Sequence, residues 1–231
     1  MAKFTPGAIV SEVRGTIAAT TFARNKGGAV IRNRIVPINR RSPLQTARRQ
    51  SLASLASSFR GLTQAQITAW NAAASNFPIS DNLGQTITMS GQQLYVRFNA
   101  NLLLINEATI SNPPNPVSFD PIAFTSLAPV ASTGVMTLAF TPTVPAGQQL
   151  VVYATRPLSA GKSFVPESEF RFLQSIAAAG TSPQLLTAAY AALFGSLTAS
   201  EGQKVFVKMY LIDEASGIAG QAVRGSGLVA A

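Results

Sequence analysis

Residues 112–116 read Asn-Pro-Pro-Asn-Pro, and this stretch divides the 231-residue chain into two differently patterned parts. Proline donates no backbone hydrogen bond and its ring clashes with a continuing helix, so neither a helix nor a central strand can run through these residues. We therefore predict two modules, residues 1–111 and residues 117–231, joined by a proline-rich linker over residues 112–116. The expected fold class is α+β.

The first module combines a strand-like start with a helical continuation. Residues 7–38 alternate in the manner of strands, and Asn25-Lys26-Gly27-Gly28 has the composition of a hairpin turn, so we predict a β-hairpin. Three later segments open with a hydroxyl residue followed three positions on by Gln, the pattern of a helix-starting capping box. A small helical cluster packed on the hairpin is therefore expected. The caps and the apolar stripes that follow them are Ser42 with Leu44, Leu52, Leu55 and Phe59; Thr63 with Ile67, Trp70 and Ala74; and Ser90 with Leu94, Phe98, Leu102 and Ile105.

The second module has the pattern of an all-β domain. Short apolar runs are separated by clusters of Gly, Pro and Ser, and they lie at residues 119–127, 135–140, 150–155, 170–176, 205–213 and 223–229. This spacing is typical of an antiparallel β-sandwich, of the fibronectin type III or immunoglobulin-like kind. Ser182-Pro183 predicts the start of a helix that ends at Phe194-Gly195, so the sandwich is expected to carry a helical insertion.

The composition removes most enzyme classes. The chain has no Cys and no His, which excludes disulfides, Cys/His zinc sites and catalysis by a Ser-His-Asp or Cys-His arrangement. Glu167 with Glu169 and Asp213 with Glu214 are the remaining carboxylate pairs; we interpret them as solubilising charges, with a catalytic pair as the alternative. We expect a protein that is not an enzyme, with no catalytic, cofactor-binding or metal-binding residues. Neither a secretory signal nor a membrane span is predicted.

Positive charge is concentrated near the N-terminus. The chain carries 18 Lys and Arg against 9 Asp and Glu, and the first 60 residues hold eleven of the cations with Glu12 as their only carboxylate. Such a segment indicates an acidic partner, either a protein surface or nucleic acid, with a merely solvated face as a further alternative. Few aromatic residues lie among the cations, which favours protein over nucleic acid. The residues predicted to bind the partner are Arg24, Lys26, Arg32, Arg34, Arg40, Arg41, Arg48 and Arg49.

Three of these positions and one aromatic residue carry more specific expectations. Arg32 and Arg34 are two apart, so on a strand they share a face. Arg48 falls within the apolar stripe of the first helix; either its stem packs there while the guanidinium reaches water, or a carboxylate of a neighbouring chain pairs with it. Trp70, the single tryptophan, is interpreted as a core anchor, with a binding surface as the alternative.

Four stretches of the first half resemble a family of proteins from tailed bacteriophages and related prophage regions. They are N-K-G-G-A-V-I-R-N-R at 25–34, S-P-L-Q-T-A-R-R-Q at 42–50, L-T-Q-A-Q-I-T-A-W-N at 62–71 and L-Y-V-R-F-N-A-N at 94–101. The resemblance implies a structural protein of the virion, made in the host cytoplasm, present as an oligomer or in many copies and bound to the major capsid protein or other virion proteins. We expect a capsid-associated accessory or decoration subunit anchored by its basic N-terminal module. A tail or neck component and a phage nucleic-acid-binding protein are the alternatives.

Overall fold

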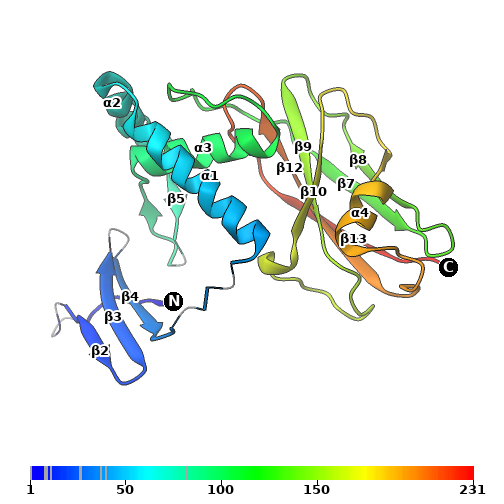
Figure 1. Ribbon diagram of the computed structural model, residues 1–231, viewed down its shortest axis with the longest axis horizontal. Coiled ribbons are helices and arrows are strands. Elements are labelled where there is room, and N and C mark those ends of the chain that lie inside the picture. The colour runs from blue at the N-terminus through cyan, green and yellow to red at the C-terminus, as the bar shows by residue number, and fades with distance from the viewer. Residues whose placement is uncertain are drawn as a thin grey trace. The chain divides into compact units, whose positions relative to one another are not determined.

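The computed structural model describes residues 2–7, 10, 12–25, 28–36, 38–39, 41–81 and 83–231. In these residues the chain is mixed α/β, with four α-helices and several antiparallel sheets (Figure 1). It divides into two compact units, Met1–Val96 and Arg97–Ala231, called unit 1 and unit 2 below. The predicted linker at 112–116 lies inside unit 2, where it forms neither helix nor strand. The expected separation of two autonomous modules stays a prediction.

The division falls inside a helix because the last residues before the linker bond to unit 2. The Asn101 side-chain amide donates to the Gly217 carbonyl (2.8 Å). Leu102 and Ile105 belong to one buried cluster with Val151 and Ile212. Within the segment, the buried Asn99 side chain donates to the Ile110 carbonyl (3.2 Å) and accepts from the Ile110 amide (2.7 Å). Residues 97–111 therefore belong with the β-rich unit, although their sequence pattern is helical.

Unit 1 begins with a four-stranded antiparallel sheet in the order β1-β4-β3-β2. Its strands are β1 (Ala2–Lys3), β2 (Gly15–Ile17), β3 (Thr20–Asn25) and β4 (Gly28–Asn33). The predicted hairpin is confirmed, since β3 and β4 pair with Asn25 opposite Gly28; the turn residues Lys26 and Gly27 lie outside the described residues. The prediction that strand structure continues to Ile38 is wrong. β4 ends at Asn33 because its partner β3 begins opposite it at Thr20, and the proline at position 37 offers no donor for further pairing.

All three predicted helices form. They are α1 (Pro43–Arg60), α2 (Gln64–Ala73) and α3 (Gly91–Leu104), and a short 3₁₀ turn η1 (Ala74–Asn76) and a two-stranded sheet of β5 (Ile79–Ser80) and β6 (Thr86–Ile87) lie between the last two. Thr63 with Gln66 and Ser90 with Gln93 form both hydrogen bonds of a capping box. At α1 the Ser42 hydroxyl accepts from the Gln45 amide (3.4 Å). These local bonds satisfy helix-end donors, which is why the sequence pattern locates the helix starts.

Aromatic side chains form the core of unit 1. Trp70 is fully buried and lies edge-on to Tyr95, with 5.3 Å between ring centroids. Tyr95 in turn contacts Phe59 at 5.4 Å. The interpretation of Trp70 as a core anchor is confirmed.

Unit 2 contains a strand in each of the six predicted apolar runs. The strands are β7 (Ala123–Pro129), β8 (Met136–Thr141), β9 (Gln148–Ala154), β10 (Arg171–Ile176), β11 (Gln184–Leu185), β12 (Lys204–Asp213) and β13 (Val223–Leu228), and the helical turns are η2 (Glu167–Glu169) and α4 (Thr187–Phe194). They form a three-stranded sheet β11-β8-β7 and a four-stranded sheet β10-β9-β12-β13. Leu138 from the first sheet and Val152 and Met209 from the second belong to one buried cluster, so the two sheets share a core.

Helix α4 and the close approach of β13 to β7 cover the core where the two sheets are not hydrogen-bonded to each other. The predicted helical insertion forms as α4, which ends at Phe194 as expected, but its predicted start at Ser182-Pro183 is wrong: Gln184 and Leu185 pair with β8 as β11, and the helix begins at Thr187. Helix α4 lies against β8 and β10 and buries Tyr190, whose hydroxyl donates to the Thr155 carbonyl (2.9 Å). On the other side β13 approaches β7 closely. A Cβ atom on Gly227 would lie 2.1 Å from the Leu127 carbonyl oxygen, and one on Gly225 would lie 2.4 Å from the Phe124 ring. Glycine at both positions is what allows the strands to approach.

Candidate functional site

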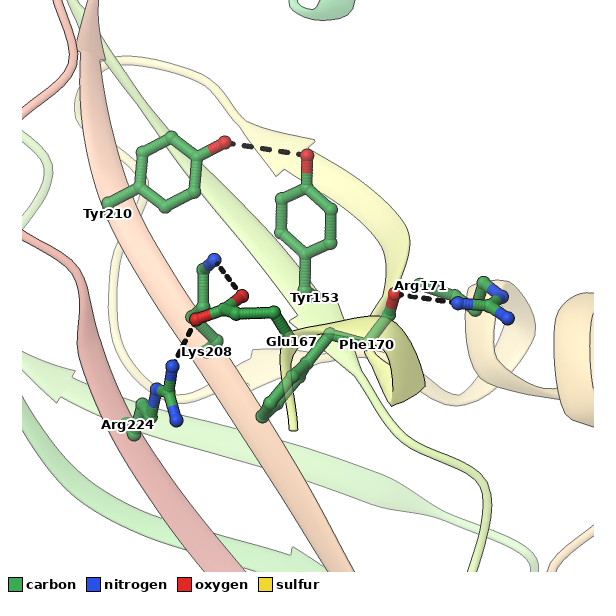
Figure 2. A network of polar contacts seen from close by, with 7 residues as sticks. All are labelled: Tyr153, Glu167, Phe170, Arg171, Lys208, Tyr210 and Arg224. Carbon is green, nitrogen blue, oxygen red and sulfur yellow. Dashed lines mark hydrogen bonds and ion pairs between the residues drawn. The ribbon is translucent and has the colours of Figure 1, made fainter. Parts of the chain in front are cut away.

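The charges of unit 2 compensate one another. Figure 2 shows Glu167 between two cations: it accepts from Lys208 Nζ (2.7 Å) and from the Arg224 guanidinium. The hydrogen bond from Lys208 is the main cause that holds the pKa of Glu167 below its ordinary value. Lys208 Nζ also lies 5.5 Å from the Tyr153 ring centroid. Because the carboxylate and both cations are satisfied locally, we interpret this cluster as a tie between η2 and the outer face of the four-stranded sheet.

The carboxylates singled out in the sequence do not converge on a site. Glu169 pairs with Arg156 (3.8 Å), a different partner from those of its neighbour Glu167. Asp213 accepts from the amide (2.9 Å) and hydroxyl (2.6 Å) of Ser216 and so holds the turn after β12. Among the described residues, no group of three or more Cys, His, Asp and Glu side chains could hold a metal ion. No helix in the described part of the chain is long and apolar enough to cross a membrane.

Unit 1, in contrast, has more cations than carboxylates, and both of its carboxylates already form ion pairs. Glu12 and Asp81 are the only acidic residues before Arg97. Asp81 Oδ2 lies 2.5 Å from Lys3 Nζ, and Glu12 Oε1 lies 2.9 Å from Arg14 Nε and 3.7 Å from an Arg24 amino group. Among the described residues of unit 1, six cations therefore form no ion pair with a carboxylate of that unit. They are Arg32, Arg34, Arg41, Arg48, Arg49 and Arg60.

The predicted partner-binding residues fall into three groups. Arg24, on β3, already shares Glu12 with Arg14. Arg32 lies in β4 and Arg34 directly follows it. Both line the same pocket, as expected for residues that share one face of a strand. The other described members are Arg41, just before α1, and Arg48 and Arg49 in its first turns, all exposed. Lys26 and Arg40 lie outside the described residues.

Exposed aliphatic side chains accompany these arginines. We call the described residues between 34 and 52 the exposed segment; it begins directly after β4 and includes the first half of α1. Its large apolar side chains have exposed fractions from 52% for Leu52 to 83% for Val36 and Ile38. The complete set is Ile35, Val36, Ile38, Leu44 and Leu52. Exposed aliphatic side chains in the same stretch of sequence as arginines without carboxylate partners have the composition of an interaction surface.

The exposed segment corrects one prediction made from the helical stripe. Leu55 and Phe59 are buried as expected, but Leu44 and Leu52 of the same stripe are exposed. The stripe continues along one face of α1, while the core of unit 1 covers only its second half. Arg48 lies between the two exposed leucines, so the expected packing of its stem is not observed. Its pairing with a carboxylate of a neighbouring chain stays a prediction.

Comparisons with known protein families, with curated proteins and with solved structures found no match.

Proposed function

We propose that the protein is a non-enzymatic structural component of a tailed-bacteriophage virion, a capsid-associated accessory subunit that binds an acidic surface of another virion protein through unit 1. The observation that carries this proposal is the exposed segment, where arginines without carboxylate partners lie beside exposed aliphatic side chains. Cations of this kind steer association with an acidic surface, and aliphatic side chains supply the area that is buried on contact.

Protein is favoured over nucleic acid because unit 1 presents no aromatic platform in its described residues. Its large exposed apolar side chains are all aliphatic there. Phe4 and Phe22 pack edge to face on each other, with 6.1 Å between centroids, and Phe59 is buried. Single-stranded nucleic acid is bound by stacking bases on exposed rings, which these side chains do not offer.

The proposal assigns unit 2 to a fibronectin type III-like sandwich. Strand order supports this: β7, β8 and β11 occupy the places of the A, B and E strands, and β10, β9, β12 and β13 those of the C′, C, F and G strands. Helix α4 then lies in the connection between E and F. Unit 2 holds seven cations and seven carboxylates, so the excess charge of the protein belongs to unit 1.

The test is binding to particles of the encoding phage stripped of this protein. A triple variant, Arg32→Gln, Arg34→Gln and Arg48→Gln, is compared with wild type at about 0.15 M salt, where the Debye length is about 8 Å. If each surface charge contributes about 0.5 kcal/mol, the triple variant binds roughly tenfold more weakly and with a smaller salt dependence. The matched control removes three cations of unit 2, Lys162, Arg171 and Lys204, and should bind like wild type.

Two further arms distinguish the alternatives. Separating emptied heads from detached tails shows which structure retains the protein, and retention by tails would replace the capsid assignment with a tail or neck assignment. Titration with single- and double-stranded DNA at the same salt concentration should give only weak binding. Tight DNA binding without saturable binding to particles would refute the proposal and favour a nucleic-acid-binding protein.

A further inference from the structure

Ile35, Val36 and Ile38 combine exposed side chains with backbone groups that have no partner among the described residues. The Arg34 amide donates to the Ala19 carbonyl (2.7 Å), which continues the β3–β4 register by one residue. Beyond it, Ile35, Val36 and Ile38 form no hydrogen bond to any other residue in the described part of the chain. Their side chains are among the most exposed apolar groups of the protein. Both the side chains and the backbone of this stretch are therefore available to a partner.

The residue types of this stretch favour a strand. Isoleucine and valine are β-branched and fit a pleated surface. Val36 precedes a proline, which restricts its own backbone to the extended region. An extended stretch with apolar side chains and unpaired backbone groups can add to the edge of another sheet, where main-chain bonds supply affinity and alternate side chains supply specificity.

We propose that residues Ile35–Ile38 add as a β-strand to a free sheet edge of the acidic virion protein that unit 1 binds, an inference that rests on the proposed function. The sequence also selects which edge of the strand is used. Successive backbone amides point to opposite edges of a strand, so Val36 and Ile38 donate on one edge and Ile35 on the other. Proline at 37 removes the second donor from the Ile35 edge. The partner strand therefore pairs with the edge formed by Val36 and Ile38.

Charge identifies the occupant as a different protein rather than a second copy. The stretch is bounded by Arg34 and Arg41, and no acidic residue occurs between Glu12 and Asp81. The same surface of another copy would bring like charges together, which opposes self-association through this stretch. A sheet edge flanked by carboxylates matches both the arginines and the unpaired backbone.

Two proline substitutions separate strand addition from simple apolar contact. Val36→Pro and Ile35→Pro each remove one exposed β-branched side chain, but only Val36→Pro removes a donor from the pairing edge. With stripped particles as the probe, Val36→Pro should bind at least tenfold more weakly, because a partner carbonyl loses its bond and stays buried. Ile35→Pro should stay within about threefold of wild type. Both variants should melt like wild type, since neither position forms a hydrogen bond in the described chain.

Hydrogen exchange gives a second measurement on the same complex. In particle-bound wild type the amides of Val36 and Ile38 should exchange more slowly than in the free protein, and the Ile35 amide should not change. Equal loss of binding in both variants, or no protection of Val36 and Ile38, would overturn the strand proposal while particle binding by wild type upholds the proposed function. Failure of wild type to bind particles would overturn both. Self-association that protects the same amides would assign the edge to a second copy and overturn the choice of partner.

Discussion

The close approach of β13 to β7 predicts a large effect from one methyl group. In Gly227→Ala the new Cβ atom would lie 2.1 Å from the Leu127 carbonyl oxygen, whereas ordinary contact begins at 3.4 Å. The obstacle is backbone, and each strand is held by its own ladder, β13 to β12 and β7 to β8. The strands must therefore separate by more than 1 Å, and neither can move alone. We expect a loss of about 3 kcal/mol, the upper end of the usual range for overpacking.

Thermal unfolding followed by far-ultraviolet circular dichroism measures this effect. A loss of about 3 kcal/mol corresponds to a fall in Tm of roughly 6–12 °C for a chain of this size. The matched control is Gly161→Ala, where an added Cβ meets no atom within 4 Å; it should leave the stability unchanged or raise it by up to about 1 kcal/mol. If Gly227→Ala melts within about 2 °C of wild type, β7 and β13 do not approach as described and the reasoning fails.

Two more predictions concern single contacts. Tyr190→Phe removes the buried hydroxyl that donates to the Thr155 carbonyl, and it should lower the free energy of unfolding in a urea titration by about 1–2 kcal/mol. The control Tyr210→Phe, in a half-buried residue, should lower it by less than about 1 kcal/mol. Equal losses in the two variants would contradict the role of the Tyr190 hydrogen bond. The hydrogen bond from Lys3 is the main cause that lowers the pKa of Asp81 below 3.8, so the contact stabilises unit 1 above that pH and is lost as the pH falls through the lowered value. Asp81→Asn should reduce the acid dependence of Trp70 fluorescence below about pH 4, and an unchanged acid transition would exclude this ion pair as its cause.

Most of the elements could be predicted from local pattern. Helices α1, α2 and α3 begin at hydroxyl caps, and the six runs of unit 2 each contain a strand. The strands that were not predicted, β1, β5, β6 and β11, have two residues each. Such strands are too short for the alternation by which a strand is recognised, and their pairing depends on residues distant in the sequence.

The candidate site was predictable in charge but not in shape. The excess of arginine before residue 60 is visible in the sequence, and the absence of carboxylate partners follows from counting. The exposure of Leu44 and Leu52 does not follow, because an apolar stripe records which face of a helix is apolar and not whether the covering surface lies in the same chain. Lys26 and Arg40, two of the predicted anchor residues, lie outside the described residues.

The close approach of β13 to β7 at Gly225 and Gly227 also limits which residues these two positions can accept. A Cβ atom at position 227 would meet the β7 backbone and one at position 225 would meet the Phe124 ring, whereas the intervening Ser226 and the flanking Arg224 and Leu228 alternate away from these contacts. We therefore expect proteins that keep this close approach of β13 to β7 to keep two glycines separated by one residue in the last strand, while the neighbouring residues vary.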